Sequence, residues 1–252
     1  MATFVLVHGS WHGAWCWHRL SQQLRAQQHR VIAPDLPGMG DDRTPLAKVT
    51  LQGWANFVID CLHAADEPVV LVGHSRGGVV ISQAAEIAPE RIRALVYVTA
   101  VLLPDGGTVS NIADQLPADS LAAIQYADDG ASSVLRTEKA ADLLYNTTPS
   151  KWVRFALGKL GPDPTEPNVT PLRLTAERYG SVPRFFIECL QDRTLGLAVQ
   201  RRMVRDMPCQ QVLSVDSDHS PFFSAPDRLA EALVSALELS RAAERIMNAD
   251  GR

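Results

Sequence analysis

The sequence predicts one α/β domain with a mostly parallel central sheet flanked by helices. Short runs rich in Val, Ile, Leu and Phe recur along the chain, and their near-continuous apolarity is typical of strands buried on both faces. Segments with helical periodicity separate these runs. The 252 residues, 46% hydrophobic and 21% charged, match an ordinary globular protein that can bury a sizeable core.

Six segments are predicted as strands: residues 2–7, 30–34, 68–72, 94–99, 184–190 and 211–215. Helices are expected over 14–27 and 50–65, where apolar residues recur at helical spacing. Another helix is expected from Pro226 to Ala242, because proline is favoured at the first position of a helix.

Residues 103–180 interrupt this alternation with short helical pieces separated by prolines and glycines. We expect this insertion to form a helical cap over one edge of the sheet, on a core made of 1–102 and 181–252. The alternative is a loosely packed surface excursion.

Charge and composition exclude several classes of function. The formal net charge of −4 offers nothing to recruit nucleic acid or an anionic membrane, so a small neutral ligand fits better. No apolar stretch approaches the roughly 20 residues of a membrane span, and residues 1–7 resemble a buried strand more than a signal peptide. The four cysteines form no C-x-x-C pair, which favours reduced thiols in the cytoplasm. The oligomeric state stays open, with a homodimer among the options.

A candidate nucleophile, Ser75, lies in the G-x-S-x-G sequence Gly73-His74-Ser75-Arg76-Gly77. A predicted strand precedes this motif and a helix follows it, which is the arrangement that exposes a serine hydroxyl at the top of an α/β sheet. Glycine is expected to be required at positions 73 and 77, because a Cβ there would crowd the tight, closely packed turn.

A serine hydroxyl needs a base, and a histidine base needs a carboxylate that orients it. Of the seven histidines only His219 follows Ser75, in the loop after the strand 211–215. That order, with the base last, is the order of the G-x-S-x-G hydrolases. His219 is therefore the predicted base.

Asp192 is the predicted acid, because it follows the strand 184–190 and so lies at the carboxyl edge of the sheet. Asp105 is the competitor. Asp216 and Asp218 are too close to His219 in sequence to reach the far side of its ring easily.

Acyl transfer also requires hydrogen-bond donors for the oxyanion. The predicted donors are the backbone amides of Arg76 and Ser10, with Gly9 allowing the early loop to approach closely. His8 and His12 are expected to hold this loop as hydrogen-bonded structural residues. The mechanism requires no metal or cofactor.

These residues together resemble the α/β-hydrolase superfamily, and within it the hydroxynitrile lyase/plant methyl esterase group with related bacterial esterases. The similarity covers nearly the whole chain and is visible in Phe4-Val5-Leu6-Val7-His8-Gly9, His12-Gly13-Ala14-Trp15, Gly73-His74-Ser75, Leu103-Pro104-Asp105, Tyr179-Gly180-Ser181-Val182 and Asp218-His219. The resemblance implies an α/β-hydrolase fold with the cap inserted after the sixth-strand region. It also implies Ser75 as nucleophile, Asp192 as acid and His219 as base.

The sequence departs from the lyases and relatives of this group at three positions. The lyases carry a threonine after the early histidine and a lysine after the catalytic histidine, where this chain has Gly9 and Ser220. Without that cation, ester hydrolysis is favoured over cyanide release. Arg76 replaces the usual Leu or Met; its side chain could contact the cap or the pocket, but we expect it to point away from the site.

The sequence therefore predicts a cytoplasmic serine hydrolase that cleaves a small or medium apolar carboxylic ester through an acyl-enzyme. The aromatic candidates for the substrate wall are Trp11, Trp152, Phe155 and Phe222. Two alternatives remain: cleavage of another acyl bond (lactone, amide or diketone carbon–carbon bond), or a small-ligand sensor that retains the three site residues.

Overall fold

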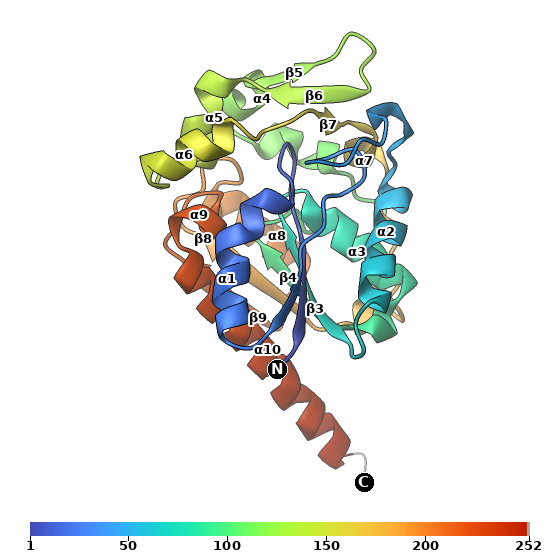
Figure 1. Ribbon diagram of the computed structural model, residues 1–252. Coiled ribbons are helices and arrows are strands. Elements are labelled where there is room, and N and C mark those ends of the chain that lie inside the picture. Colours follow the sequence, from blue (N-terminus) through green and yellow to red (C-terminus); the bar gives the residue numbers. More distant parts are fainter. Residues whose placement is uncertain (251–252) are drawn as a thin grey trace.

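The computed structural model describes residues 1–250 and contains a six-stranded sheet in the order β2-β1-β3-β4-β8-β9 (Figure 1). All neighbouring strands of this sheet are parallel. Its strands are β1 (Thr3–Val7), β2 (Arg30–Ile32), β3 (Val69–His74), β4 (Ile92–Val98), β8 (Arg184–Cys189) and β9 (Gln211–Val215). Each predicted strand segment overlaps one of these strands, so the predicted parallel sheet is confirmed.

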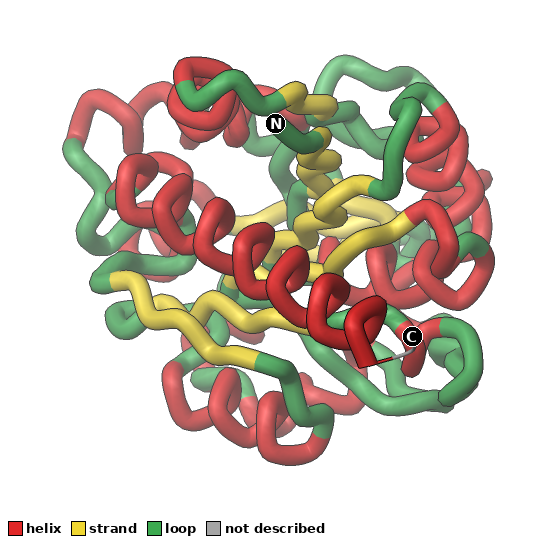
Figure 2. Tube along the Cα trace, turned by 90° about the horizontal axis from the view of Figure 1, so that it is seen from below, coloured by secondary structure: helices red, strands yellow, loops and turns green. Residues whose placement is uncertain are grey.

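Helices cover both faces of the sheet. Helices α1 (His18–Ala26) and α10 (Pro226–Asp250) pack on one face, where α10 crosses the strands (Figure 2). The other face is covered by α2 (Leu51–His63), α3 (Gly77–Ile87) and α8 (Leu197–Asp206). Short helices complete the core: η1 (Ala14–Trp17), η2 (Leu46–Lys48), η3 (Pro89–Arg91), η5 (Tyr179–Ser181) and α9 (Pro221–Ser224).

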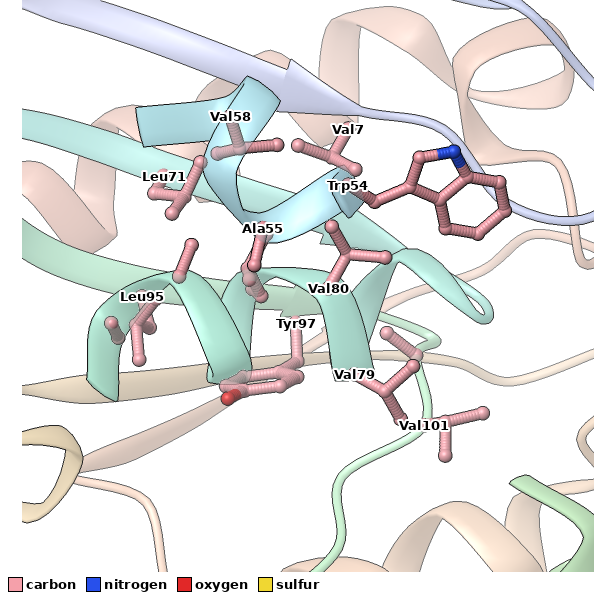
Figure 3. Packing of buried hydrophobic residues seen from close by; sticks show 14 of the residues in the cluster. Val7, Trp54, Ala55, Val58, Leu71, Val79, Val80, Leu95, Tyr97 and Val101 are labelled. Carbon is pink, nitrogen blue, oxygen red and sulfur yellow. The ribbon is translucent and has the colours of Figure 1, made fainter. Parts of the chain in front are cut away.

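The central strands are apolar on both faces because each face has its own helical layer. In β3, Leu71 belongs to the cluster under α2 and α3, whereas its neighbours Val70 and Val72 belong to the cluster under α1 and α10. Figure 3 shows Leu71 beside Val58 of α2, and Leu95 belongs to the same cluster. Alternate residues of a strand point to opposite faces, so a doubly covered strand must be apolar throughout.

Residues 103–180 lie over one end of the sheet (Figure 1). The elements of this segment are η4 (Val109–Gln115), α4 (Ala118–Ala122), β5 (Ile124–Tyr126), β6 (Ser132–Leu135), α5 (Thr137–Leu144), α6 (Ser150–Leu157), β7 (Asp163–Pro164) and α7 (Glu166–Val169). The resemblance placed the insertion after the sixth-strand region, whereas in this chain it follows β4, the fourth strand of the sheet.

The cap was predicted to be helical, but besides its helices it contains a small antiparallel sheet formed by β5, β6 and β7. Strands of two to four residues are too short to show a periodicity in the sequence. The loosely packed alternative is wrong: Leu143, Leu144 and Tyr145 are buried and belong to the same apolar cluster as α1 and α10. Within residues 1–250 no helix is both long and apolar enough to cross a bilayer.

Candidate active site

The predicted site residues follow four parallel strands at the edge of the sheet beneath the cap (Figure 1). Ser10 comes after β1, Ser75 after β3, Asp192 after β8 and His219 after β9. Because the strands are parallel, their carboxyl ends meet at one edge. The topology therefore brings together residues that are far apart in sequence.

Ser75, His219 and Asp192 form an unbroken hydrogen-bonded chain. The Nε2 atom of His219 lies 3.0 Å from Ser75 Oγ, and its Nδ1 atom lies 2.7 Å from Asp192 Oδ2. His219 and Asp192 are buried, whereas Ser75 is half-buried. The competitor Asp105 accepts instead a hydrogen bond from the Leu174 amide, so the geometry selects Asp192 as the partner of the histidine.

Ser75 has a φ of +51°, in the left-handed region that residues with a Cβ rarely adopt. Such a backbone typically costs about 1–3 kcal/mol and persists only where its surroundings hold it. The Ser75 carbonyl accepts hydrogen bonds from the amides of Gly78 and Val101. A Cβ at Gly73 would lie 2.7 Å from the Gly77 carbonyl oxygen, and one at Gly77 would lie 2.7 Å from that of Val7. Both glycines are thus required by the close approach of backbone.

The Asp192 carboxylate is held from several directions. Its Oδ1 atom accepts the amides of Thr194 at 2.7 Å and Leu195 at 2.8 Å. Its Oδ2 atom accepts the Thr99 hydroxyl in addition to facing His219. These bonds fix the face that the carboxylate presents to the histidine. Sequence reasoning missed Thr99, although a polar residue directly after the buried strand β4 was a usable signal.

Asp218 is a second residue that sequence reasoning undervalued. It does not face the His219 ring, but its carboxylate accepts hydrogen bonds from the Thr147 amide, the Thr148 hydroxyl, the Ser220 amide and the Ser224 hydroxyl. The first two partners belong to the connection between α5 and α6. Asp218 therefore fixes the loop that carries His219 and ties it to the cap.

The loop after β1 lies directly against the turn that carries Ser75 (the serine turn, residues 73–77). A Cβ at Gly9 would lie 2.7 Å from Ser75 Cβ, so only glycine fits there without a shift. His8 Nδ1 donates to the Gly9 carbonyl and its Nε2 accepts the Leu36 amide. His12 Nδ1 donates to the Ser10 carbonyl, at 2.7 Å, and its Nε2 accepts the Tyr145 hydroxyl. The prediction that both histidines hold the loop is confirmed.

Burial makes these histidines neutral. It lowers the pKa of His8 to about 4 and that of His12 to about 3, and it lowers the pKa of His74 well below its usual value. A neutral imidazole has one donor and one acceptor nitrogen, which matches the bonds of His8 and His12. These rings are thus fixed supports in the site's neighbourhood.

A cavity of about 100 Å³ opens onto Ser75. Its wall is mostly apolar, with contributions from the core and the cap: Ser10, Trp11, Arg76, Val101, Val109, Ile112, Leu116, Ile124, Tyr126, Ser133, Asn168, Thr194 and Leu195. Of the four predicted aromatic residues, only Trp11 is part of this wall.

The other three aromatic predictions were wrong. Phe222 is fully buried against the rings of His74 and Trp17 and is not part of the cavity wall. Trp152 stacks on Phe223, and Phe155 packs edge-on against both of them. The fold brings Phe223, a buried core residue, next to α6, and Trp152 and Phe155 of that helix pack against it.

The Arg76 side chain was expected to point away from the site, but the structure shows the other option, a contact with the cap. Its guanidinium forms two hydrogen bonds of 2.6 Å to Asp163 of β7, and both side chains are almost completely buried (2% and 1% exposed). It also lies over the Trp54 ring, 4.5 Å from the centroid. The positive charge is thus neutralised by Asp163, 87 residues away in sequence.

The family model of the alpha/beta hydrolase family matches residues 4–232. The chain belongs to that family. Among curated relatives of this hydrolase, methylesterase 7 of Arabidopsis thaliana is 34% identical, over 92% of this chain and 94% of its own. Putative methylesterase 14, chloroplastic, from the same plant is also 34% identical, over 94% of this chain and 72% of its own.

Solved structures agree with this assignment. A pyrethroid hydrolase from Sphingobium faniae JZ-2 superposes with a TM-score of 0.84 at 32% identity, covering 93% of this hydrolase and 96% of that chain. Polyneuridine aldehyde esterase gives a TM-score of 0.86 at 26% identity, covering 93% and 98%. The predicted resemblance to the methyl esterase group is confirmed, and this α/β-hydrolase is a carboxylesterase-like, ester-cleaving enzyme.

Proposed function

We propose that this hydrolase cleaves a small apolar carboxylic ester through an acyl-enzyme on Ser75. The observation that carries the proposal is the hydrogen-bonded chain from Ser75 through His219 to Asp192. A serine Oγ at 3.0 Å from an imidazole nitrogen is within reach of proton transfer, and a carboxylate on the other nitrogen stabilises the imidazolium that forms.

In the first half-reaction His219 takes the proton of Ser75 while Oγ attacks the ester carbonyl. The oxyanion of the tetrahedral intermediate is held by the backbone amides of Ser10 and Arg76. His219 then gives its proton to the departing alcohol, which leaves an acyl-Ser75. In the second half-reaction His219 deprotonates a water that attacks the acyl carbon, and collapse of the intermediate releases the acid and returns the proton to Ser75.

The cavity supports a small, apolar substrate. A space of about 100 Å³ is well below the roughly 300–1,000 Å³ of typical drug-sized ligand sites. Arg76 is the one charged residue in the described wall, and its guanidinium is paired with Asp163. The site therefore offers no free cation to a departing anion such as cyanide, which supports hydrolysis over a lyase reaction.

Free thiols support the proposed location of the enzyme. Cys16, Cys61, Cys189 and Cys209 are all unpaired in the described structure. Unpaired cysteines are typical of reducing compartments, and we propose the cytoplasm. The net charge of −4 does not attract nucleic acid or an anionic membrane surface. We therefore propose that the enzyme acts on a small molecule.

A fluorophosphonate probe combined with a substrate panel tests the function. Rapid labelling of wild type, loss of labelling in Ser75→Ala, and turnover of short esters would support the proposal. Turnover of lactones, amides or diketones in place of esters would move the enzyme to another acyl bond. A folded protein that takes no label and turns over no substrate would indicate a sensor.

A further inference from the structure

The Arg76–Asp163 pair lies at the junction of three parts of the molecule. Arg76 is the residue after the nucleophile, Asp163 belongs to the cap strand β7, and Trp11 belongs to the loop after β1. Arg76 also donates to the Pro164 carbonyl at 3.0 Å. A buried ion pair contributes little to stability once the loss of hydration is counted, so its position in the molecule is more informative than its charge.

Asp163 makes a third contact, to the Trp11 backbone. Its Oδ1 atom accepts the Trp11 amide at 3.0 Å, in addition to the guanidinium of Arg76 at 2.6 Å. Two residues earlier, the Gly161 amide donates to the Trp11 carbonyl at 3.0 Å. Residues 161–163 thus hold both polar backbone groups of Trp11.

Trp11 needs this support because its φ is +59°, in the left-handed region. A residue with a Cβ keeps that conformation only where its surroundings impose it. The amide immediately before it is that of Ser10, whose direction depends on how this turn is held. The Trp11 turn therefore sets the aim of one of the two proposed oxyanion donors.

We propose that Asp163 is a positioning residue for ester hydrolysis. One carboxylate holds the Trp11 amide and the Arg76 side chain together, and so fixes the separation between the Ser10 and Arg76 amides that receive the oxyanion. Oxyanion donors are effective because they are already in place before charge develops. This inference rests on the proposed function, since it assigns a role only to an enzyme that forms a tetrahedral intermediate.

Two double variants separate positioning from charge. Both remove the ion pair without leaving an unpaired buried charge: Arg76→Met/Asp163→Asn keeps a side-chain oxygen that can accept the Trp11 amide, whereas Arg76→Met/Asp163→Leu does not. The matched control is Arg93→Met/Glu244→Gln, which removes an ion pair between β4 and α10. If the leucine variant does not fold, Arg76→Met/Asp163→Val provides a smaller apolar replacement.

The readouts are kcat and KM for a short ester, and the affinity for a trifluoromethyl ketone that forms an oxyanion on Ser75. We expect kcat of the leucine variant to be roughly tenfold or more below that of the asparagine variant, with KM within about threefold. Affinity for the ketone should weaken by the same factor as kcat/KM, because the ketone adduct mimics the tetrahedral intermediate.

Equal kcat values in the two double variants, or a loss confined to KM, would overturn this inference while wild-type turnover left the proposed function standing. A wild-type enzyme that neither hydrolyses esters nor takes up fluorophosphonate would overturn both.

Discussion

The Ser75 hydroxyl and the His219 imidazole lie 3.0 Å apart although 144 residues separate them in sequence. Their strands, β3 and β9, are not neighbours, since β4 and β8 lie between them. The contact depends on two loops at the same edge of a parallel sheet. The Ser75 carbonyl is held by the amides of Gly78 and Val101, and the loop with His219 is held by Asp218. Four consequences of this arrangement can be measured.

Asp192→Asn should lower kcat by about 10³- to 10⁴-fold with a small change in KM, because an amide cannot stabilise the imidazolium and favours the wrong tautomer of His219. Steady-state kinetics with a short ester would show this. Asp105→Asn is the matched control and should stay within about threefold of wild type. A large loss in the control, or none in Asp192→Asn, would contradict the assignment of the acid.

Gly9→Ala should lower kcat by about 10²-fold, because the new Cβ would lie 2.7 Å from Ser75 Cβ and 3.0 Å from the His74 carbonyl oxygen. The loop must move away, and the Ser10 amide moves with it. Gly196→Ala, whose Cβ would enter open space, is the control. The idea fails if Gly9→Ala retains full kcat in a correctly folded protein.

The buried histidines should make the protein sensitive to acid. The pKa of His12 is about 3 in the folded state against 6.5 ordinarily, so between these values the unfolded chain binds a proton that the folded chain does not. Stability is therefore lost as pH falls below about 6.5, by about 2 kcal/mol at pH 5 for this one group.

Urea unfolding between pH 5 and 7 would measure this slope. His12→Asn keeps a donor for the Ser10 carbonyl but does not titrate. The slope of the unfolding free energy against pH should therefore decrease by the contribution of about one proton. The same change at the exposed His63 provides a comparison. An unaltered slope in His12→Asn would exclude His12 as a source of the acid sensitivity.

Substitutions in the cap should show which residues contact the substrate and which only stabilise the fold. Ile112 represents the cavity wall, and Trp152 represents the aromatic group that it forms with Phe155 and Phe223. Ile112→Ala removes a buried side chain from the wall and should raise kcat/KM for bulkier acyl groups relative to short ones, by roughly tenfold or more per accommodated methylene. Trp152→Ala removes a ring stacked on Phe223 and should lower the thermal stability without changing this ratio. An altered acyl preference in Trp152→Ala would indicate that Trp152 does contact the substrate.

Much of the core and the three central residues could be predicted because their signals are local. Continuous apolar runs identify strands covered on both sides, and parallel strands place their following loops at one edge. Ser75 was recognisable from its glycines, and His219 was the only histidine after it. Asp192 followed from its place directly after a buried strand.

The cap and its contacts required the tertiary structure. Strands as short as β7 have no readable periodicity, and the partners of an aromatic side chain are chosen by packing. Trp152 and Phe155 therefore pack against Phe223, and neither is part of the cavity wall.

The sequence by itself determined the parallel sheet, the turn that carries Ser75, and the order of nucleophile, acid and base. Each of these was predicted from local patterns, namely the apolar runs and the place of each site residue just after one of them. Only the tertiary structure decided where the Arg76 side chain goes. Its partner Asp163 is 87 residues away, and the same carboxylate meets the Trp11 amide from 152 residues away. Such pairings depend on how the cap packs on the core, and no local sequence pattern predicts which residues so far apart in the chain will meet.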